Sequence, residues 1–411
     1  MNSTGLVKNP VLLVLAATGI AAASGLAFLT HAPNRLVSGT GISLAQTVTA
    51  GDGLSTAFAL AATLIPALML GAGIFLQPRR TVHFWVAAAA TSLLAGLVGV
   101  AADHAARLAF MAADSTGGGV PGIARTSFGG AFWILAALAW LAAGDAVRRL
   151  GLTPLWRFVA NAMVIAPVIL MLATGVLDSL SLLREYANRQ DVFDAALLRH
   201  AQLVAASLAP ALAVGVPLGV ASARNGKFMV AVRPALFATL NVIQTIPSIA
   251  FFGLLMAPLA LLAASVPALA RWGVKGIGMA PAVIALALYS LLPLVRSTAA
   301  GLSQVPRPVV DAALGMGLSP RQVFWRVEVP LALPVFLAGL RVATVQTIGM
   351  AVVAALIGAG GFGAIMFQGL LGGALDLVLL GVVPVVAMAV LADATLKTVA
   401  MSLAHEKPDT V

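Results

Sequence analysis

The chain has 411 residues, of which 61% are hydrophobic and 9% are charged, and its mean hydropathy is +1.03. Soluble domains are about 45–50% apolar and about 25% charged, so this composition excludes an ordinary water-soluble globular protein. The formal net charge is +10, and the absence of cysteine excludes a disulfide framework and a cysteine nucleophile. We therefore expect an all-α polytopic membrane protein.

Ten apolar runs are long enough to cross a membrane, because a spanning helix needs about 20 predominantly apolar residues. The first run follows Lys8 and predicts a retained helix, although residues 21–24 also resemble the cleavage region of a signal peptide. In chain order the predicted helices lie near 11–30, 57–76, 83–111, 128–147, 158–178, 201–222, 235–262, 280–298, 333–357 and 377–397.

The most polar stretch of the chain, 179–200, separates these runs into two sets of five. It predicts a module boundary, with an N-terminal membrane extension over 1–190 and a second module over 191–411. An interfacial amphipathic helix and a docking segment are both compatible with its composition.

Basic residues concentrate in the loops that fall on one side of the predicted spans. With the N-terminus inside, 16 of the 24 Lys and Arg residues lie on the cytoplasmic side. This asymmetry follows the positive-inside rule and favours two cytoplasmic termini. We therefore interpret the positive charge as a determinant of topology and expect no nucleic-acid partner.

The one long cytoplasmic connection, 299–332, contains signals for a first short helix. Pro308 is suited to the first position of a helix that runs to Met316. Gly317 is suited to the left-handed residue that closes a helix, because it has no Cβ to clash.

A second short helix is predicted to begin after Ser319. Ser319 is expected as its N-cap, with Pro320 at the first position and Gln322 completing a capping box. Pro330 and Pro334 are expected to limit its continuation. The first helix also carries a large apolar surface, which fits either an interfacial helix pair on its own bundle or a docking surface for a partner.

The same loop carries a spaced motif. Asp311, Ala312 and Ala313 are followed after three residues by Gly317, and then after nine residues by the run 327–330. This pattern resembles the E-A-A-x3-G-x9-I-x-L-P signature of permeases in binding-protein-dependent ABC importers. The resemblance covers about 200–400 and is most similar to the osmoprotectant branch, for glycine betaine, choline and related compounds, on the further segments 215–219, 241–248, 288–298 and 357–363.

The resemblance implies a five-helix permease core in which the loop 299–332 is the coupling helix that docks on an ATPase. Asp311 replaces the usual Glu, and Val327 and Val329 replace Ile and Leu, so charge sign and apolar character are kept. The coupling residues that it implies are Asp311, Ala312, Ala313, Gly317, Val327 and Pro330.

The resemblance also implies partners and a location. The chain has no G-x-x-x-x-G-K-[ST] motif, so ATP and Mg are expected on a partner chain, and we expect neither a bound cofactor nor enzyme activity. The implied partners are cytoplasmic ABC ATPase subunits, an extracytoplasmic substrate-binding protein, membrane lipid, and a second permease copy or a homologous permease. The implied location is the bacterial cytoplasmic (inner) membrane.

Several prolines fall within the predicted helices of the second module, where a broken helix must line a cavity or be buried in protein. The candidates for a translocation path are Gln244, Pro247, Tyr289 and Pro293, while ordinary kinks are the alternative. The five histidines lack the spacing of metal ligands, so no metal site is expected.

Two other functions stay open. One is an ABC importer permease for amino acids or another small solute. The other is an ion-coupled secondary transporter, which would use charges within the membrane. Asp103 and Arg107 lie four residues apart in a predicted helix and are the candidates for it, although they also suit a pair at the membrane interface.

Overall fold

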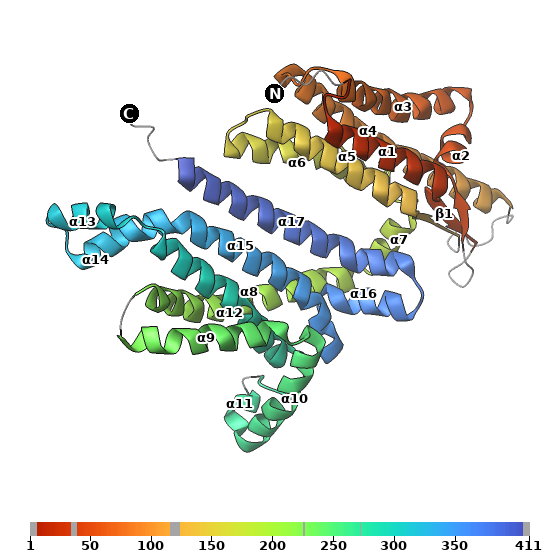
Figure 1. Ribbon diagram of the computed structural model, residues 1–411. Helices are drawn as coiled ribbons and strands as arrows, with labels where there is room; N and C mark the ends of the chain where they lie inside the picture. The colour runs from red at the N-terminus through yellow and green to blue at the C-terminus, as the bar shows by residue number, and fades with distance from the viewer. Residues whose placement is uncertain (1–5, 34–38, 116–123, 225–226, 272, 406–411) are drawn as a thin grey trace. The chain divides into compact units, whose positions relative to one another are not determined.

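The computed structural model describes residues 6–33, 39–115, 124–224, 227–271 and 273–405 (Figure 1). The chain forms two compact units, Met1–Asn188 and Arg189–Val411. Within the described residues, nine helices are long and apolar enough to cross a membrane. The prediction of a helical multi-pass protein is therefore confirmed, with two differences in the helices and one small sheet that the sequence did not predict.

The first unit is a helical bundle in which α4 packs against α3, α5 and α6. Small residues such as Ala90, Ala101 and Ala143 are fully buried in this bundle, which lets helix backbones approach closely. Its helices are α1 (Pro10–Gly25), α2 (Leu44–Thr49), α3 (Gly53–Phe75), α4 (Arg80–Ser115), α5 (Gly130–Arg149), α6 (Pro154–Ala173) and α7 (Ser181–Asn188).

The predicted helix over 11–30 is shorter than expected. Helix α1 has 16 residues, and the chain enters a strand at Leu29. Asn9 begins α1 because its side chain accepts a hydrogen bond from the Leu12 amide over 3.2 Å.

A three-stranded antiparallel sheet completes the first unit. It consists of β1 (Leu29–Ala32), β2 (Thr40–Ile42) and β3 (Arg125–Phe128), in the order β2-β1-β3. Strands of three or four residues are too short to show a reliable alternation of apolar and polar side chains, which explains why the sequence did not reveal them. A buried ion pair, Arg125 to Glu185 at 2.5 Å, joins β3 to α7.

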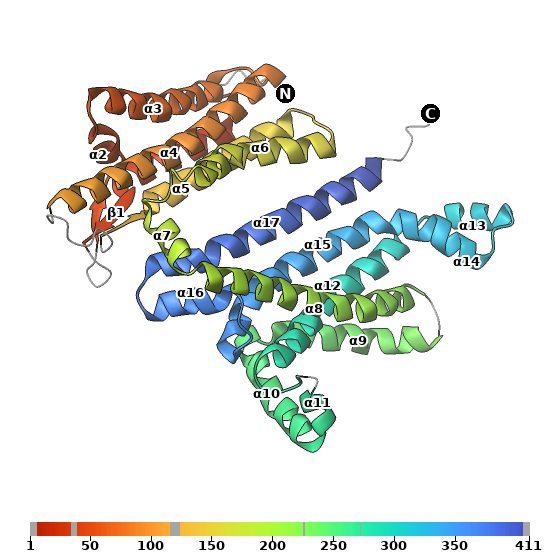
Figure 2. The same ribbon diagram turned by 180° about the vertical axis from the view of Figure 1, so that it is seen from behind.

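The second unit is arranged around α12, which packs against α8, α9, α10 and α15 (Figures 1 and 2). Helix α17 packs against α15 and α16. The elements before the long loop are α8 (Gln190–Ala223), α9 (Lys227–Thr245), α10 (Ser248–Ser265), α11 (Pro267–Arg271) and α12 (Met279–Ser303). After it come α15 (Val329–Val353), the 3-10 turn η2 (Ala354–Ile357), α16 (Phe362–Leu371) and α17 (Leu375–His405).

Glycines allow α8 to approach α12 closely. A Cβ added at Gly219 would lie 2.4 Å from Thr298 Cβ, and one added at Gly215 would lie 3.2 Å from Leu294 Cβ. Because the two glycines are four residues apart, they lie on one face of α8. Part of the segment 215–219 therefore builds the core of this unit.

The predicted single helix over 235–262 is wrong, because the chain forms two helices there. Helix α9 ends at Thr245 and α10 begins at Ser248, with Pro247 in an extended conformation between them. Proline lacks an N–H and disfavours the helical conformation at the preceding residue, so the apolar run breaks at Ile246. Helices α10 and α11 lie at the end of the bundle where α9 finishes (Figures 1 and 2).

The glycine-rich segment 358–361 forms a tight turn before α16. Gly358, Gly360 and Gly361 all have positive φ angles, of 79°, 82° and 77°. The turn is held to α8, because Arg199 Nε donates to the carbonyl of Ala359 over 2.9 Å. Helix α16 follows directly.

Candidate functional site

The long loop forms two short helices at one end of the second unit, beside the end of α8 and the start of α9 (Figures 1 and 2). The first is α13 (Arg307–Gly315) and the second is α14 (Pro320–Val323). The prediction of two short helices within 299–332 is confirmed. Pro308 lies in the first turn of α13, one residue later than expected.

A hydrogen-bonded turn closes α13 at Gly317, which has a φ of 88°. The amide of Gly317 donates to the Leu314 carbonyl over 2.9 Å, and the amide of Leu318 donates to the Ala313 carbonyl over 3.2 Å. This pair of bonds defines a Schellman motif, in which glycine adopts the left-handed conformation at the least cost. The predicted role of Gly317 in ending the helix is confirmed.

The second helix begins as the sequence predicts. The Ser319 amide donates to Gln322 Oε1 over 2.8 Å, and the Gln322 amide donates to Ser319 Oγ over 3.4 Å, so the capping box is complete. Pro320 occupies the first turn.

The expectation that Pro330 and Pro334 limit this second helix is wrong. After α14 the chain forms a π-helical turn, η1 (Phe324–Glu328), and continues as α15 without a break. The amide of Val329 donates to the Phe324 carbonyl, five residues back, so the wider turn accommodates Pro330 at the start of α15. The loop is therefore connected to the bundle by one long helical segment, Pro320–Ile357.

The signature residues divide between a buried and an exposed set. Ala313 is buried, whereas Asp311 and Ala312 are exposed. Within the part of the chain that the structure describes, Asp311 makes no ion pair. Val327 and Pro330 lie in η1 and in the first turn of α15. One face of the loop is thus free to meet a partner, and the motif's carboxylate lies on it.

Large apolar side chains of the same loop are also exposed. Met316 is 76% exposed and Trp325 is 60% exposed, and Val309 and Leu314 are each more than two-fifths exposed. Exposed apolar groups beside a charged group are typical of a protein interaction surface. We call the side chains of Val309, Asp311, Leu314, Met316 and Trp325 the loop surface.

One ion pair at the base of the loop was missed by the sequence analysis. Arg224, at the end of α8, donates from Nη2 to Glu328 Oε2 over 2.8 Å, and its guanidinium lies 5.2 Å from the centre of the Phe324 ring. Glu328 occupies the unspecified position of the signature, and Arg224 lies more than 100 residues away, so spacing alone could not reveal the pair.

Three of the four candidates for the translocation path lie together at the break between α9 and α10. Gln244 Nε2 donates to the Tyr289 carbonyl over 2.8 Å, and the Tyr289 hydroxyl donates to the Ile246 carbonyl over 2.5 Å. Ile246 directly precedes Pro247, so the tyrosine satisfies a carbonyl that the broken helix leaves free. Pro293 lies one turn further along α12 and faces α15, since a Cβ at Gly339 would be 3.0 Å from its carbonyl oxygen.

Asp103 and Arg107 form the predicted i, i+4 pair on α4, with a distance of 2.5 Å between Asp103 Oδ2 and Arg107 Nη2. The pair stays within one helix and is partly exposed. Within the described part of the chain, no three His, Asp or Glu side chains gather closely enough to hold a metal ion.

Two family models match the chain, one over each unit. Residues 7–183 match the N-terminal domain of the ABC transporter permease YehY. Residues 215–404 match the inner membrane component of binding-protein-dependent transport systems.

Curated relatives match somewhat less than half of the chain. The osmoprotectant import permease protein OsmW of Salmonella typhimurium is 38% identical over 195 residues, which is 47% of this chain and 84% of the relative. The glycine betaine/carnitine/choline transport permease OpuCD of Bacillus subtilis is 36% identical over 181 residues, covering 44% of this chain and 70% of the relative. A solved structure of the inward-facing MetNI methionine ABC transporter shares 19% sequence identity with this chain, and its TM-score is 0.44. The match covers 53% of this chain and 98% of the MetNI chain.

Proposed function

We propose that this chain, which belongs to the family of binding-protein-dependent ABC importer permeases, forms the membrane pathway of an ATP-driven importer. The substrates that we propose are osmoprotectants such as glycine betaine or choline. The family is that of multi-pass inner-membrane permeases, and the apolar helices agree with this location. The substrate class is taken from the relatives, whose names specify osmoprotectants, glycine betaine, carnitine and choline.

The observation that carries the proposal is the loop surface. It presents an exposed carboxylate and exposed apolar side chains on α13, at its C-cap and in η1, and hydrogen bonds close the end of α13 and the start of α14. A stiff, preformed surface loses little entropy on docking, which suits a contact that transmits force. The occupant that we assign to it is a cytoplasmic ABC ATPase, which would hold the ATP and Mg that this chain has no motif to bind.

The mechanism follows from how the loop is connected. Helix α12 enters the loop, and the long segment Pro320–Ile357 leaves it, so a displacement of α13 and α14 acts directly on two core helices. Closure of the ATPase dimer would then shift the equilibrium between inward and outward states of the permease. An extracytoplasmic binding protein would deliver the ligand to the outward state, and both chain termini would lie in the cytoplasm.

The assembly that we propose contains two permease subunits, as two copies of this chain or as one copy with a homologous permease. Two ATPase subunits would dock on the two loop surfaces. The chain itself would not hydrolyse ATP. The first unit, which matches the YehY N-terminal domain, would be a membrane extension of this permease.

Co-purification tests the docking claim. A tagged wild-type chain in detergent is expected to retain an ATPase subunit, and the double variant Asp311→Lys/Gly317→Arg is expected to release it while inserting normally in the membrane. The first change reverses the charge of the loop surface and the second adds bulk at the turn. Asp52→Lys, at the start of α3 in the first unit, is the control for a charge reversal elsewhere. A well-folded wild type without any ATPase would favour an ion-coupled transporter.

A further inference from the structure

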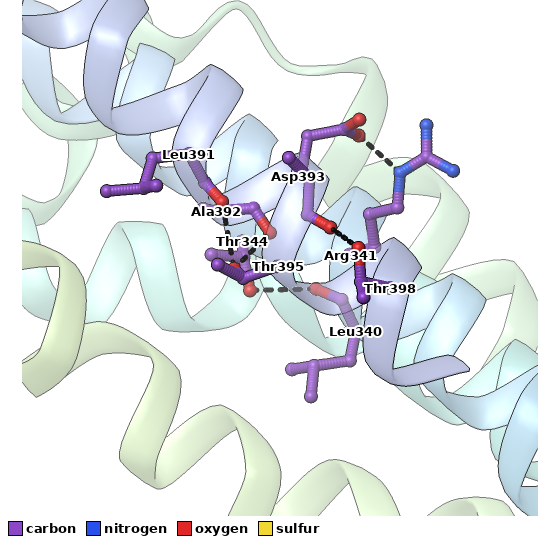
Figure 3. A network of polar contacts seen from close by, with 9 residues as sticks. Leu340, Arg341, Thr344, Leu391, Ala392, Asp393, Thr395 and Thr398 are labelled. Atoms are coloured by element: carbon purple, nitrogen blue, oxygen red, sulfur yellow. Dashed lines mark hydrogen bonds and ion pairs between the residues drawn. The ribbon is translucent and has the colours of Figure 1, made fainter. Parts of the chain in front are cut away.

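An ion pair lies in the middle of two apolar helices of the second unit. Arg341 is 12 residues from either end of α15, and Asp393 is 12 residues before the end of α17. Arg341 donates from Nε to Asp393 Oδ1 (Figure 3). The nearby hydroxyls of Thr344, Thr395 and Thr398 donate to carbonyls of their own helices and not to the side chains of the ion pair.

The pair faces away from the centre of the bundle. Gly339 marks the face of α15 that meets α12, because a Cβ there would lie 2.0 Å from Ser297 Oγ. Arg341 follows two residues later, about 200° further round the helix. Its side chain therefore points away from α12 and meets α17.

The contact leaves charged atoms unused on both partners. It engages only Nε of the guanidinium and one oxygen of the carboxylate. Within the described part of the chain, both terminal amino groups of Arg341 and the second oxygen of Asp393 have no other partner. The two side chains are 41% and 38% exposed, so these atoms are accessible.

Exposed charge on a membrane-spanning helix is unfavourable against lipid, and such residues usually face a water-filled pathway or a bundle interior. The two terminal amino groups of an arginine present a planar fork that matches a carboxylate. The free carboxylate oxygen of Asp393, beside this fork, would attract a cation. A ligand that carries both charges, separated by a short linker, complements the pair on both sides.

We propose that Arg341 and Asp393 form a site for zwitterionic substrates in the translocation pathway, where Arg341 binds a carboxylate and Asp393 faces a quaternary ammonium group. The inference rests on the proposed function and narrows its substrate class to zwitterions such as glycine betaine. Choline, which has the quaternary ammonium group but no carboxylate, would lose the contact with Arg341.

Uptake of radiolabelled glycine betaine and choline tests this site. The host is a bacterium that lacks osmoprotectant uptake of its own and expresses this chain together with the ATPase and binding protein encoded in the same operon as the chain. Arg341→Lys keeps the charge and the contact with Asp393 but removes the fork. We expect it to lower glycine betaine uptake about tenfold or more and choline uptake much less. Asp393→Asn should lower the uptake of both. Arg296→Gln, which removes an α12 arginine bonded to Asn241, is the control.

The charge-swapped variant Arg341→Asp/Asp393→Arg separates a substrate site from a structural pair. A structural pair would be restored by the swap, whereas a substrate site would present its charges in the reversed order and stay impaired. The inference would be overturned by normal uptake in Arg341→Lys or in the swapped variant. It would also be overturned if either variant lost the permease dimer. Wild-type uptake of choline alone would overturn it as well. A wild type that imports neither compound would instead overturn the proposed function.

Discussion

Arg224 and Glu328 connect the end of α8 to the base of the long loop 299–332. Their side chains meet at 2.8 Å, and the same guanidinium lies over the ring of Phe324, one turn before Glu328. Helix α8 packs along α12 and α15, so this contact links the loop to a third core helix besides the two that enter and leave it. A displacement of the loop would therefore reach α8 through a side-chain contact.

The first prediction concerns this contact. Glu328→Arg should lower the free energy of unfolding only modestly, because an ion pair with one partner in solvent contributes about 0–1 kcal/mol and the Arg224 side chain is 55% exposed. It should nevertheless lower the substrate imported per ATP hydrolysed, since α8 no longer follows the loop. Parallel assays of uptake and ATPase activity measure this ratio. Recovery of the ratio in Arg224→Glu/Glu328→Arg is expected, and its absence would show that the contact does not couple the two elements.

The second prediction concerns the turn at Gly317. Gly317→Ala should destabilise the loop by about 1–2 kcal/mol, the usual cost of a left-handed conformation for a residue with a Cβ. No atom lies within 4 Å of the added Cβ, so the cost is one of backbone conformation alone. Gly315→Ala is a matched control, because Gly315 is helical and its added Cβ also meets no atom.

Retention of the ATPase during purification measures the effect. Gly317→Ala is expected to lower retention, and Gly315→Ala is expected to maintain it, since alanine favours the helix by about 1 kcal/mol over glycine. Equal retention by the two variants would mean that the Schellman turn is not required for docking.

The sequence predicted local structure best where one residue decides it. Gly317 had to adopt a positive φ, and Ser319 with Gln322 had the spacing of a capping box, and both features are present. Pro247 and Pro330 show the limit of such reasoning. Pro247 was placed inside a predicted helix because its surroundings are apolar, yet it breaks that helix. Pro330 was expected to limit a helix, yet it lies in the first turn of α15. A π-helical turn accommodates Pro330, and a π-helical turn cannot be predicted from the sequence pattern.

Long-range pairs were beyond prediction from one sequence. Arg224 with Glu328 and Arg341 with Asp393 each join residues that are 52 or more positions apart. The residues were visible as charges, but only the packing of α8, α15 and α17 brings them together. Gln244 and Tyr289 were predicted as pathway candidates, and the structure shows a structural role for them: Gln244 donates to the Tyr289 carbonyl of α12, and Tyr289 donates to the Ile246 carbonyl at the break before Pro247.

The third prediction tests this structural role of Tyr289. Tyr289→Phe keeps the ring, which packs edge-on against Phe251 at 5.3 Å, and removes only the hydroxyl. The Ile246 carbonyl then loses its donor, which should destabilise the protein by about 1–3 kcal/mol. Thermal unfolding in detergent should show a lower Tm. An unchanged Tm would indicate that water or lipid headgroups replace the hydroxyl.

The fourth prediction concerns the first unit, where Arg125 and Glu185 join β3 to α7. Glu185 is 1% exposed, so replacing Arg125 removes a cationic partner from a buried carboxylate. Arg125→Met should therefore cost about 3–5 kcal/mol. The double variant Arg125→Met/Glu185→Leu should cost clearly less, because no charge remains buried. Unfolding of wild type, both single variants and the double variant gives the coupling energy of the pair. Additive effects would show that the two side chains act independently and that other contacts hold α7 to the sheet.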